Sequence, residues 1–182
     1  SRNRIASYSP HVYRLAQLED WRLSGNLLDE LPLVVGDVDL LRETRVWEVG
    51  LGMMTRLRRL AASWNRIRSW PQQMDQLANL EELSLAHNQM PSMEGGLPPH
   101  LRFLDVSHNQ IQDLNPEVVT LTALEALDVS CNALTDLPEG LRNLQKRERM
   151  PSHTNRLTKL SVRLGELGKL KKLELATNRL DD

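Results

Sequence analysis

Several residue types are scarce in this 182-residue chain, and each scarcity excludes a class of protein. The single cysteine, Cys131, excludes a disulfide framework and a multi-cysteine zinc site within the chain. The formal net charge of −1 lacks the basic excess that neutralises a nucleic-acid backbone, so we expect no direct binding of nucleic acid. No apolar run approaches the roughly 20 residues of a membrane-spanning helix, and the opening SRNRIASYSPHVY lacks the apolar stretch of a signal peptide.

Catalytic and phosphate-binding signatures are absent as well. The sequence contains none of the motifs GxGxxG, GxxxxGK[ST], HExxH and GxSxG. Its glycine pairs, Gly50 with Gly52 and Gly95 with Gly96, lie in connecting segments that have no phosphate-loop context, and we interpret the second pair as a turn. We therefore expect neither an enzyme nor a cofactor.

Leucine is the residue in excess, with 35 copies against one phenylalanine and two tyrosines. Such a bias calls for a search for an internal repeat. Five good copies of the motif L-x-x-L-x-L-x-x-N-x-L share one register, and an earlier copy, LEDWRLSGNLL, precedes them. The asparagines that mark the register are Asn26, Asn65, Asn88, Asn109, Asn132, Asn155 and Asn178. From Asn65 onward they follow one another at intervals of 23, 21, 23, 23 and 23 residues.

This pattern resembles the leucine-rich-repeat family over roughly residues 15–182, and the 23-residue unit with LPxxLxxL is similar to its typical intracellular subclass. The resemblance implies an α/β repeat fold, a solenoid of about seven repeats. A curved parallel β-sheet would form its concave side, and short helices or 3-10 turns its convex side. It also implies a non-catalytic scaffold or adaptor that binds one or more proteins through the concave face and takes no small-molecule substrate.

The residues support this architecture on physical grounds. Each copy alternates apolar and polar residues, as in Leu83-Ser84-Leu85, which is the period of a short strand with one buried face. The motif asparagine follows the strand, where the chain must turn. A buried amide offers donors and an acceptor to the backbone groups that the turn leaves unpaired. We therefore expect a ladder of asparagine side chains, in which replacement by leucine costs about 1–3 kcal/mol.

Residues 1–17 are expected to form an N-terminal cap or flank, and residues 18–182 the repeat array. Two stretches, at about 41–56 and 145–156, depart from the register. In the first we interpret RETRVWEVGLGMM as a degenerate, shortened copy with Leu41, Thr44 and Val46 in the strand positions. An irregular loop is the alternative.

The second irregular stretch lies before Asn155. The positions that leucine takes elsewhere hold Arg147, Met150 and Ser152, and Pro151 lies among them. Proline disfavours a paired strand, so this copy should bulge or lose strand hydrogen bonds. It would serve as a partner-contact loop or as a solvated insertion. The array then ends abruptly, so Leu173 and Leu175 should face an open end; either the array is truncated or another subunit covers it.

One group of residues stands out on the face that the resemblance makes concave. In this family the variable positions of LxxLxLxxN point into the hollow of the solenoid. Parallel strands place equivalent residues of adjacent copies about 4.8 Å apart. These columns bring together Trp64, His87, Phe103 and His108, next to Asp105 and Asp128, while Arg59 and Glu82 share a column with Phe103.

Exposed aromatic side chains on a sheet favour a surface that a partner covers, so we predict a partner-binding patch here. The alternative is that Trp64 and Phe103 only cover neighbouring strands. We expect Asp105 and Asp128 to meet a basic partner rather than to act as an acid–base pair.

Metal binding is a further candidate chemistry, because His87, His108 and Cys131 share a column. The strand spacing separates the ends of this column by about 10 Å, whereas zinc–ligand bonds are about 2.0–2.3 Å long. We therefore expect no metal site, but exposed histidines that titrate near about pH 6–7 and make binding sensitive to pH.

Two other functions stay open from the sequence. The chain could be a structural subunit locked in a large assembly of the axonemal or ribonucleoprotein type, or the recognition region of a longer multidomain enzyme. The resemblance to the intracellular subclass, without the cysteine caps of extracellular members, implies an intracellular protein. We expect it in the cytoplasm, with the cytoskeleton or cilium as a narrower setting.

Overall fold

A computed structural model describes residues 3–9, 12, 14–31, 51–71, 73–143, 149–160 and 170–180. The described residues form seven strands and four 3-10 helices. The strands are β1 (Asp20–Arg22), β2 (Arg59–Ala61), β3 (Glu82–Ser84), β4 (Phe103–Asp105), β5 (Ala126–Asp128), β6 (Arg149–Pro151) and β7 (Lys172–Glu174). The 3-10 helices are η2 (Leu51–Met53), η3 (Met74–Gln76), η4 (Pro116–Thr120) and η5 (Glu139–Asn143).

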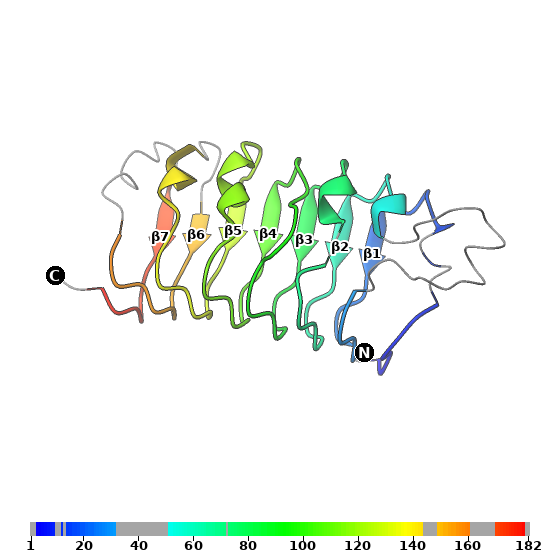
Figure 1. Cartoon of the computed structure of the whole chain (residues 1–182), viewed down its shortest axis with the longest axis horizontal. Coiled ribbons are helices and arrows are strands. Elements are labelled where there is room, and N and C mark those ends of the chain that lie inside the picture. Colours follow the sequence, from blue (N-terminus) through cyan, green and yellow to red (C-terminus); the bar gives the residue numbers. More distant parts are fainter. Residues whose placement is uncertain are drawn as a thin grey trace.

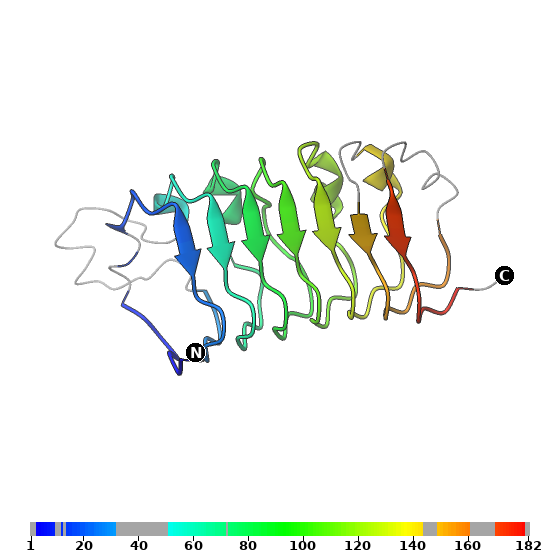
Figure 2. The same ribbon diagram turned by 180° about the vertical axis from the view of Figure 1, so that it is seen from behind.

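The seven strands lie side by side in one parallel sheet, in the same order as in the chain (Figure 1). Seen from behind, the sheet faces the viewer and the 3-10 helices form a second layer beyond it (Figure 2). This arrangement confirms the predicted solenoid with a parallel sheet on one side and short 3-10 turns on the other. Among the described residues, no helix combines the length and the apolar character needed to cross a bilayer.

The 3-10 helices are short because a 23-residue unit leaves few residues for the return path. η4 illustrates how one begins. The side chain of Asn115 accepts a hydrogen bond from the Glu117 N–H at 2.8 Å, and Pro116 occupies the first helical position. Val118 is buried and fixes the turn to the core.

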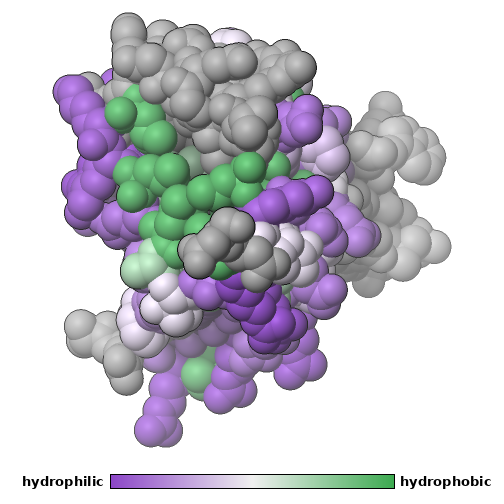
Figure 3. Space-filling view, turned by 90° about the vertical axis from the view of Figure 1, so that its left-hand side faces the viewer, coloured by the Kyte–Doolittle hydropathy of each residue, from purple (hydrophilic) through white to green (hydrophobic). Residues whose placement is uncertain are grey.

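The core is a single apolar cluster between the two layers. The middle residue of each strand points into it: Trp21, Leu60, Leu83, Leu104, Leu127, Met150 and Leu173. At the β7 end, Leu173 and Leu175 are only half-buried. Figure 3 views the molecule from this end and shows apolar atoms that reach the surface.

The predicted asparagine ladder is present at every repeat. Asn88 shows the pattern: its Oδ1 accepts a hydrogen bond from the Ile67 N–H at 3.0 Å, and its Nδ2 donates to the Ala62 and Leu85 carbonyls. One side chain thereby satisfies backbone groups of two adjacent repeats. The Oδ1 atoms of Asn26, Asn65, Asn88, Asn109, Asn132, Asn155 and Asn178 all accept in this way.

The ladder extends further toward the N-terminus than the sequence analysis expected. The Ile5 N–H donates to Asn26 Oδ1 at 3.2 Å, and the Leu27 N–H donates to the Ile5 carbonyl at 2.9 Å. Leu28 makes the same two kinds of bond with Asn65 and Arg66 one repeat later. Residues 3–5 therefore continue the repeat register. The missed signal was the position of Asn3, which precedes Asn26 by one 23-residue period.

The sheet holds no strand of the degenerate copy interpreted at about residues 41–56. β1 pairs directly with β2, with Asp20 opposite Arg59, so no strand lies between them. The sheet thus passes directly from the repeat of Asn26 to the repeat of Asn65. Its described end forms η2, from which Leu51 points into the core. Residues 41–50, with Leu41, Thr44 and Val46, lie outside the described residues.

The copy before Asn155, which was expected to bulge or to lose strand hydrogen bonds, does so only on one side. β6 forms and pairs over three residues with β7, so the strand is not lost. On the other side only Ala126 and Arg149 are in register with each other, whereas the earlier strand pairs match three residues. Pro151 explains the difference, because proline has no N–H to donate to β5. Met150 and Ser152 occupy the leucine positions as expected and are buried. Arg147 lies outside the described residues.

Candidate functional site

The outward-facing residues of β1 to β6 line a groove of about 530 Å³ along the sheet. Each strand contributes its first and third residues, because its middle residue points into the core. The register aligns Asp20, Arg59, Glu82, Phe103 and Ala126 in one row, and Arg22, Ala61, Ser84, Asp105 and Asp128 in the next. The concave columns expected from the sequence are therefore real.

Asp105 and Asp128 lie directly opposite each other on β4 and β5. Each is anchored by the serine two residues later. Ser107 donates to Asp105 Oδ1 from its N–H at 3.1 Å and its hydroxyl at 2.7 Å, and Ser130 does the same for Asp128 at 2.9 and 2.6 Å. Neither carboxylate forms an ion pair with another described residue. Two like charges face each other across adjacent strands, which is unfavourable until a cation approaches.

The N-terminal end of the groove carries its own charge pairs. Arg59 contacts Asp20 at 3.3 Å through Nε, and Arg22 reaches the same carboxylate at 2.9 Å. A hydrogen bond from Arg22 and the charges of both arginines lower the pKa of Asp20. Arg59 is thus engaged within the chain. Glu82 is exposed in the same row, between Arg59 and Phe103.

Phe103 is the aromatic residue of the groove. Its side chain is 39% exposed, between Glu82 and Ala126 in the row. The Arg102 guanidinium lies 5.6 Å from the ring centroid and also bonds Glu125 at 2.9 Å through Nε. This fixed cation borders an exposed apolar surface that a partner could cover.

Trp64, His87 and His108 lie in turns rather than on the strands. They precede their asparagines and share a left-handed backbone conformation, with φ of 59°, 53° and 52°. The other members of this column are Gly25, Cys131, Thr154 and Thr177, all with positive φ. In every one of these turns except that of Thr177, the N–H of the left-handed residue bonds a carbonyl of the following repeat, for example Trp64 to Ala86 at 2.9 Å. The solenoid therefore imposes a conformation that residues other than glycine and asparagine adopt at a cost.

The three rings form a continuous stack. Trp64 and His87 have centroids 3.6 Å apart and His87 and His108 3.9 Å apart, each pair with an interplanar angle of 14°. Trp64 is 54% exposed. Burial of the imidazole between its neighbours lowers the pKa of His87, the charge of His108 lowers it further, and Asp105 acts in the opposite direction. The expectation of an ordinary exposed histidine is thus wrong for His87.

The single patch expected from the sequence consists of two surfaces. Phe103, Asp105, Asp128, Arg59 and Glu82 line the groove on the sheet. Trp64 and His87 instead line a separate hollow at the turns, and His108 continues their stack. The reason is the left-handed turn, which the repeat period does not reveal and which turns these rings away from the strand rows.

Cys131 follows His108 in the same column and is half-buried as a free thiol. Within the described part of the chain, no three histidine, cysteine or acidic side chains are grouped so that they could hold a metal ion. Only Trp64, His87 and His108 of this column form a stack of rings.

Comparisons with known proteins place this geometry in a family. Residues 99–143 match the family model for leucine-rich repeats in two copies. Mouse podocan is 35% identical over 123 residues, which cover 61% of this chain and 20% of podocan. A leucine-rich-repeat protein of Leptospira interrogans superposes with a TM-score of 0.72 and 27% identity, over 99% of this chain and 48% of its own.

A solved plant structure resembles this chain about as closely as the Leptospira protein does. The leucine-rich-repeat ectodomain of a membrane receptor kinase from Arabidopsis thaliana, solved with Casparian strip integrity factor 2, has a TM-score of 0.76 and 28% identity. The match covers 96% of this chain and 20% of the ectodomain. The chain thus spans less than half the length of each of these relatives.

The molecule is a parallel β-solenoid whose turns are joined by an asparagine ladder. Its repeat motif and its fold are those of the leucine-rich-repeat proteins. Proteins of this family typically act in protein–protein interaction.

Proposed function

We propose that this chain is a non-catalytic interaction module whose concave groove binds a protein segment carrying a basic side chain. The observation that carries the proposal is the pair Asp105 and Asp128, held in register by Ser107 and Ser130 and without a cationic partner among the described residues. A lysine or arginine placed between them relieves the repulsion of the two carboxylates.

Phe103 supplies the second element of the proposed interface. The ring lies in the same groove, and a partner that covers it removes apolar surface from water. Aromatic residues contribute strongly to binding when neighbouring contacts exclude water around them. The groove volume of about 530 Å³ fits a few side chains rather than a whole domain, so an extended segment is the occupant that we propose.

The test is affinity capture from native lysate followed by mass spectrometry. The wild-type chain is compared with the double variant Asp105→Asn and Asp128→Asn, and with Phe103→Ala. Asparagine keeps an oxygen that accepts the serine hydrogen bonds, so the double variant removes charge with little change of structure. Asp113→Asn is the matched control, because Asp113 is an exposed aspartate between β4 and η4.

The proposal expects a small set of stoichiometric partners that are lost with the double variant and reduced with Phe103→Ala. Retention of every partner by both variants would contradict it. Recovery of one large complex that is indifferent to the groove variants would instead favour a structural subunit. We keep an intracellular location as part of the proposal, on the ground of the single half-buried thiol of Cys131.

A further inference from the structure

The concave groove carries charges of both signs, and they lie on different strands. Arg149 is the first residue of β6, is exposed, and lines the groove together with Asp105 and Asp128. In the register it follows Phe103 and Ala126 along one row. The groove is therefore acidic over β4 and β5 and basic over β6.

Arg149 forms no ion pair with another residue that the structure describes. A hydrogen bond from Lys172 lowers the pKa of Glu174, and the charge of Arg149 contributes less to this shift. The Glu174 carboxylate forms its ion pair with Lys172. Arg22 and Arg59, at the other end of the groove, are both engaged in ion pairs. Of the described cations that line the groove, Arg149 is thus the one available to an anion from outside.

The two carboxylates of the groove each keep one oxygen for a cation from outside. The hydrogen bonds from Ser107 and Ser130 all go to the Oδ1 atoms. Asp105 Oδ2 accepts a longer bond of 3.4 Å from Ser84, and Asp128 Oδ2 accepts none from a described residue. Both sites of charge are therefore open to a ligand at the same time.

The distance between these two sites sets the spacing of charges in a segment that reaches both. Adjacent strands lie about 4.8 Å apart, so β6 is about 7 Å beyond the midpoint of the carboxylate pair. Arg149 begins its strand whereas Asp105 and Asp128 end theirs, which adds about 6.6 Å along the strand and gives a diagonal of about 10 Å. Side chains on one face of an extended segment recur about every 6.6 Å. Charges two or four residues apart therefore reach both sites, because the long Arg149 side chain spans the difference.

We propose that the groove binds an extended protein segment in which a basic and an acidic side chain are two or four residues apart. The basic side chain lies between Asp105 and Asp128, and the acidic side chain pairs with Arg149. This inference rests on the proposed function. It adds that the partner carries charges of both signs at a fixed spacing.

Two repulsions narrow the class of partner. A purely basic segment that lies along the groove brings a cation to Arg149, and like charges across an interface are unfavourable. A polyanion such as a nucleic-acid backbone meets the carboxylates of Asp105 and Asp128. A segment with both signs of charge avoids both repulsions and pairs each available group of the groove.

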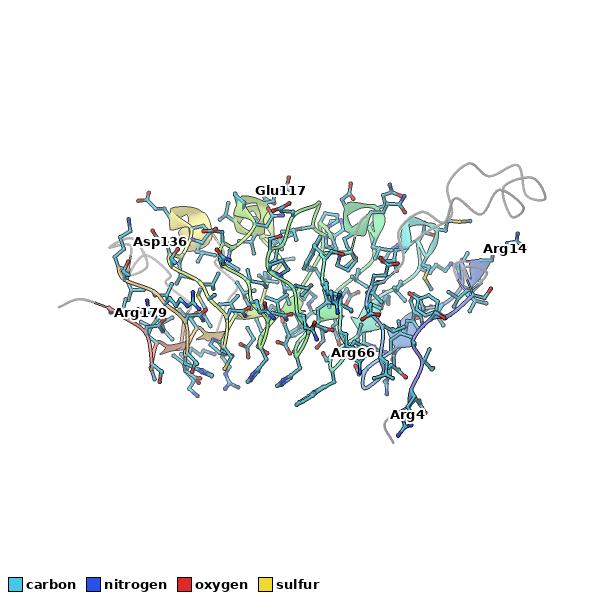
Figure 4. All side chains as sticks on the ribbon, turned by 60° about the horizontal axis from the view of Figure 1, so that its bottom comes forward. Arg4, Arg14, Arg66, Glu117, Asp136 and Arg179 are labelled. Carbon is cyan, nitrogen blue, oxygen red and sulfur yellow. The ribbon has the colours of Figure 1, made fainter. Side chains whose placement is uncertain are left out.

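The experiment selects binders from a library of random peptides of about nine residues displayed on phage, which in extended form span about 30 Å and cover the groove. The wild-type chain is compared with Arg149→Glu and with the double variant Asp105→Asn and Asp128→Asn. Arg179→Glu is the matched control, because Arg179 is exposed and does not line the groove. Figure 4 labels Arg179 at the β7 end of the solenoid. Circular dichroism verifies that each variant is folded.

We expect the wild type and Arg179→Glu to enrich peptides in which a basic residue lies two or four residues from an acidic one. Arg149→Glu should instead enrich peptides with two basic residues at these spacings. In fluorescence anisotropy, a peptide selected by the wild type should bind Arg149→Glu about tenfold more weakly. Exchange of the acidic residue of that peptide for lysine should restore its binding to Arg149→Glu, a rescue that a merely structural role of Arg149 would not give.

Two results would overturn this inference and leave the proposed function intact. One is enrichment of basic residues by the wild type without acidic residues at these spacings, and the other is an unchanged preference of Arg149→Glu for acidic residues. Two further results would contradict the proposed function as well. These are a failure of the wild type to enrich basic residues, and equal enrichment of basic residues by the double variant Asp105→Asn and Asp128→Asn.

Discussion

The fifth and sixth repeats differ in their strands and agree in their turns. β5 has a full leucine layer, in which Leu124, Leu127 and Val129 are buried. The sixth repeat places Met150 and Ser152 in those positions and has Pro151 in its strand.

The asparagines that follow these strands bond almost identically. Asn132 Nδ2 donates to Val106 and Val129 at 3.0 and 3.1 Å, and Asn155 Nδ2 donates to Val129 and Ser152 at 3.0 and 3.1 Å. Both Oδ1 atoms accept at 3.0 Å. The comparison teaches that the turn holds the register of the solenoid where the strand is poorly suited to pairing.

The largest expected effect comes from breaking the ladder in both repeats. Asn132→Leu and Asn155→Leu should each lower the free energy of unfolding by about 3 kcal/mol, because several backbone groups lose their partners. Urea unfolding followed by circular dichroism measures both. If Asn155→Leu costs less than half as much as Asn132→Leu, the turn does not hold the sixth repeat and the comparison fails.

Substitutions of two serines give the next largest expected effects on the free energy of unfolding, and these effects have opposite signs. The Ser152 hydroxyl is buried and has no hydrogen-bond partner in the structure, whereas the Ser130 hydroxyl bonds Asp128 at 2.6 Å. Ser152→Ala should therefore raise the free energy of unfolding by about 1 kcal/mol, and Ser130→Ala should lower it by about 1 kcal/mol. The direction in which the urea midpoint of each variant shifts shows whether the substitution stabilises or destabilises the chain. Destabilisation by Ser152→Ala would mean that the hydroxyl has a partner.

Backbone strain in the turn of the sixth repeat predicts a smaller gain. Thr154 has φ of 55°, which is costly for a β-branched residue, whereas asparagine tolerates this region. Thr154→Asn should raise the thermal midpoint by a few degrees, which corresponds to about 0.5–1 kcal/mol. Thr158→Asn is the control, since Thr158 is exposed and outside the positive-φ column. An equal gain from both variants would show that strain is not the cause.

The smallest expected effect is a pH dependence of the ring stack in the regular repeats. The pKa of His87 is lowered from its ordinary value of 6.5, so the unfolded chain takes up a proton before the folded chain does. Its contribution to stability is therefore full above about pH 6.5 and is lost as the pH falls through the interval below that value. Asp20 and Glu174, whose pKa values are also lowered, lose their contributions only at more acidic pH.

The measurement compares urea midpoints at about pH 7.5 and pH 5.5, on either side of the ordinary histidine pKa. His87→Gln should show a smaller decrease than the wild type on acidification. His153→Gln is the control, because His153 lies outside the ring stack. A decrease of the same size in the wild type and His87→Gln would exclude His87 as the source.

Much of this fold could be predicted because a repeat shows the same physical constraint several times. The alternation in Leu83-Ser84-Leu85 predicts the strand, and the asparagine spacing predicts the register that places Asp105 opposite Asp128. The asparagine spacing did not predict the structure between Asn26 and Asn65, because the interval there is not a multiple of the period. Periodicity alone did not show whether a further strand lies between the two in the sheet, which the pairing of β1 with β2 decides.

The candidate sites were only half predictable, for a conformational reason. The sequence by itself determined the repeat period, the buried leucine layer, the asparagine ladder and the rows of residues on the sheet. The tertiary structure alone decided that Trp64 and His87 leave the sheet rows and line a separate hollow at the turns. A period reports which residues recur at equivalent positions, whereas the direction of a side chain depends on the backbone dihedral angles of its turn. Those angles are set by hydrogen bonds to the neighbouring repeat.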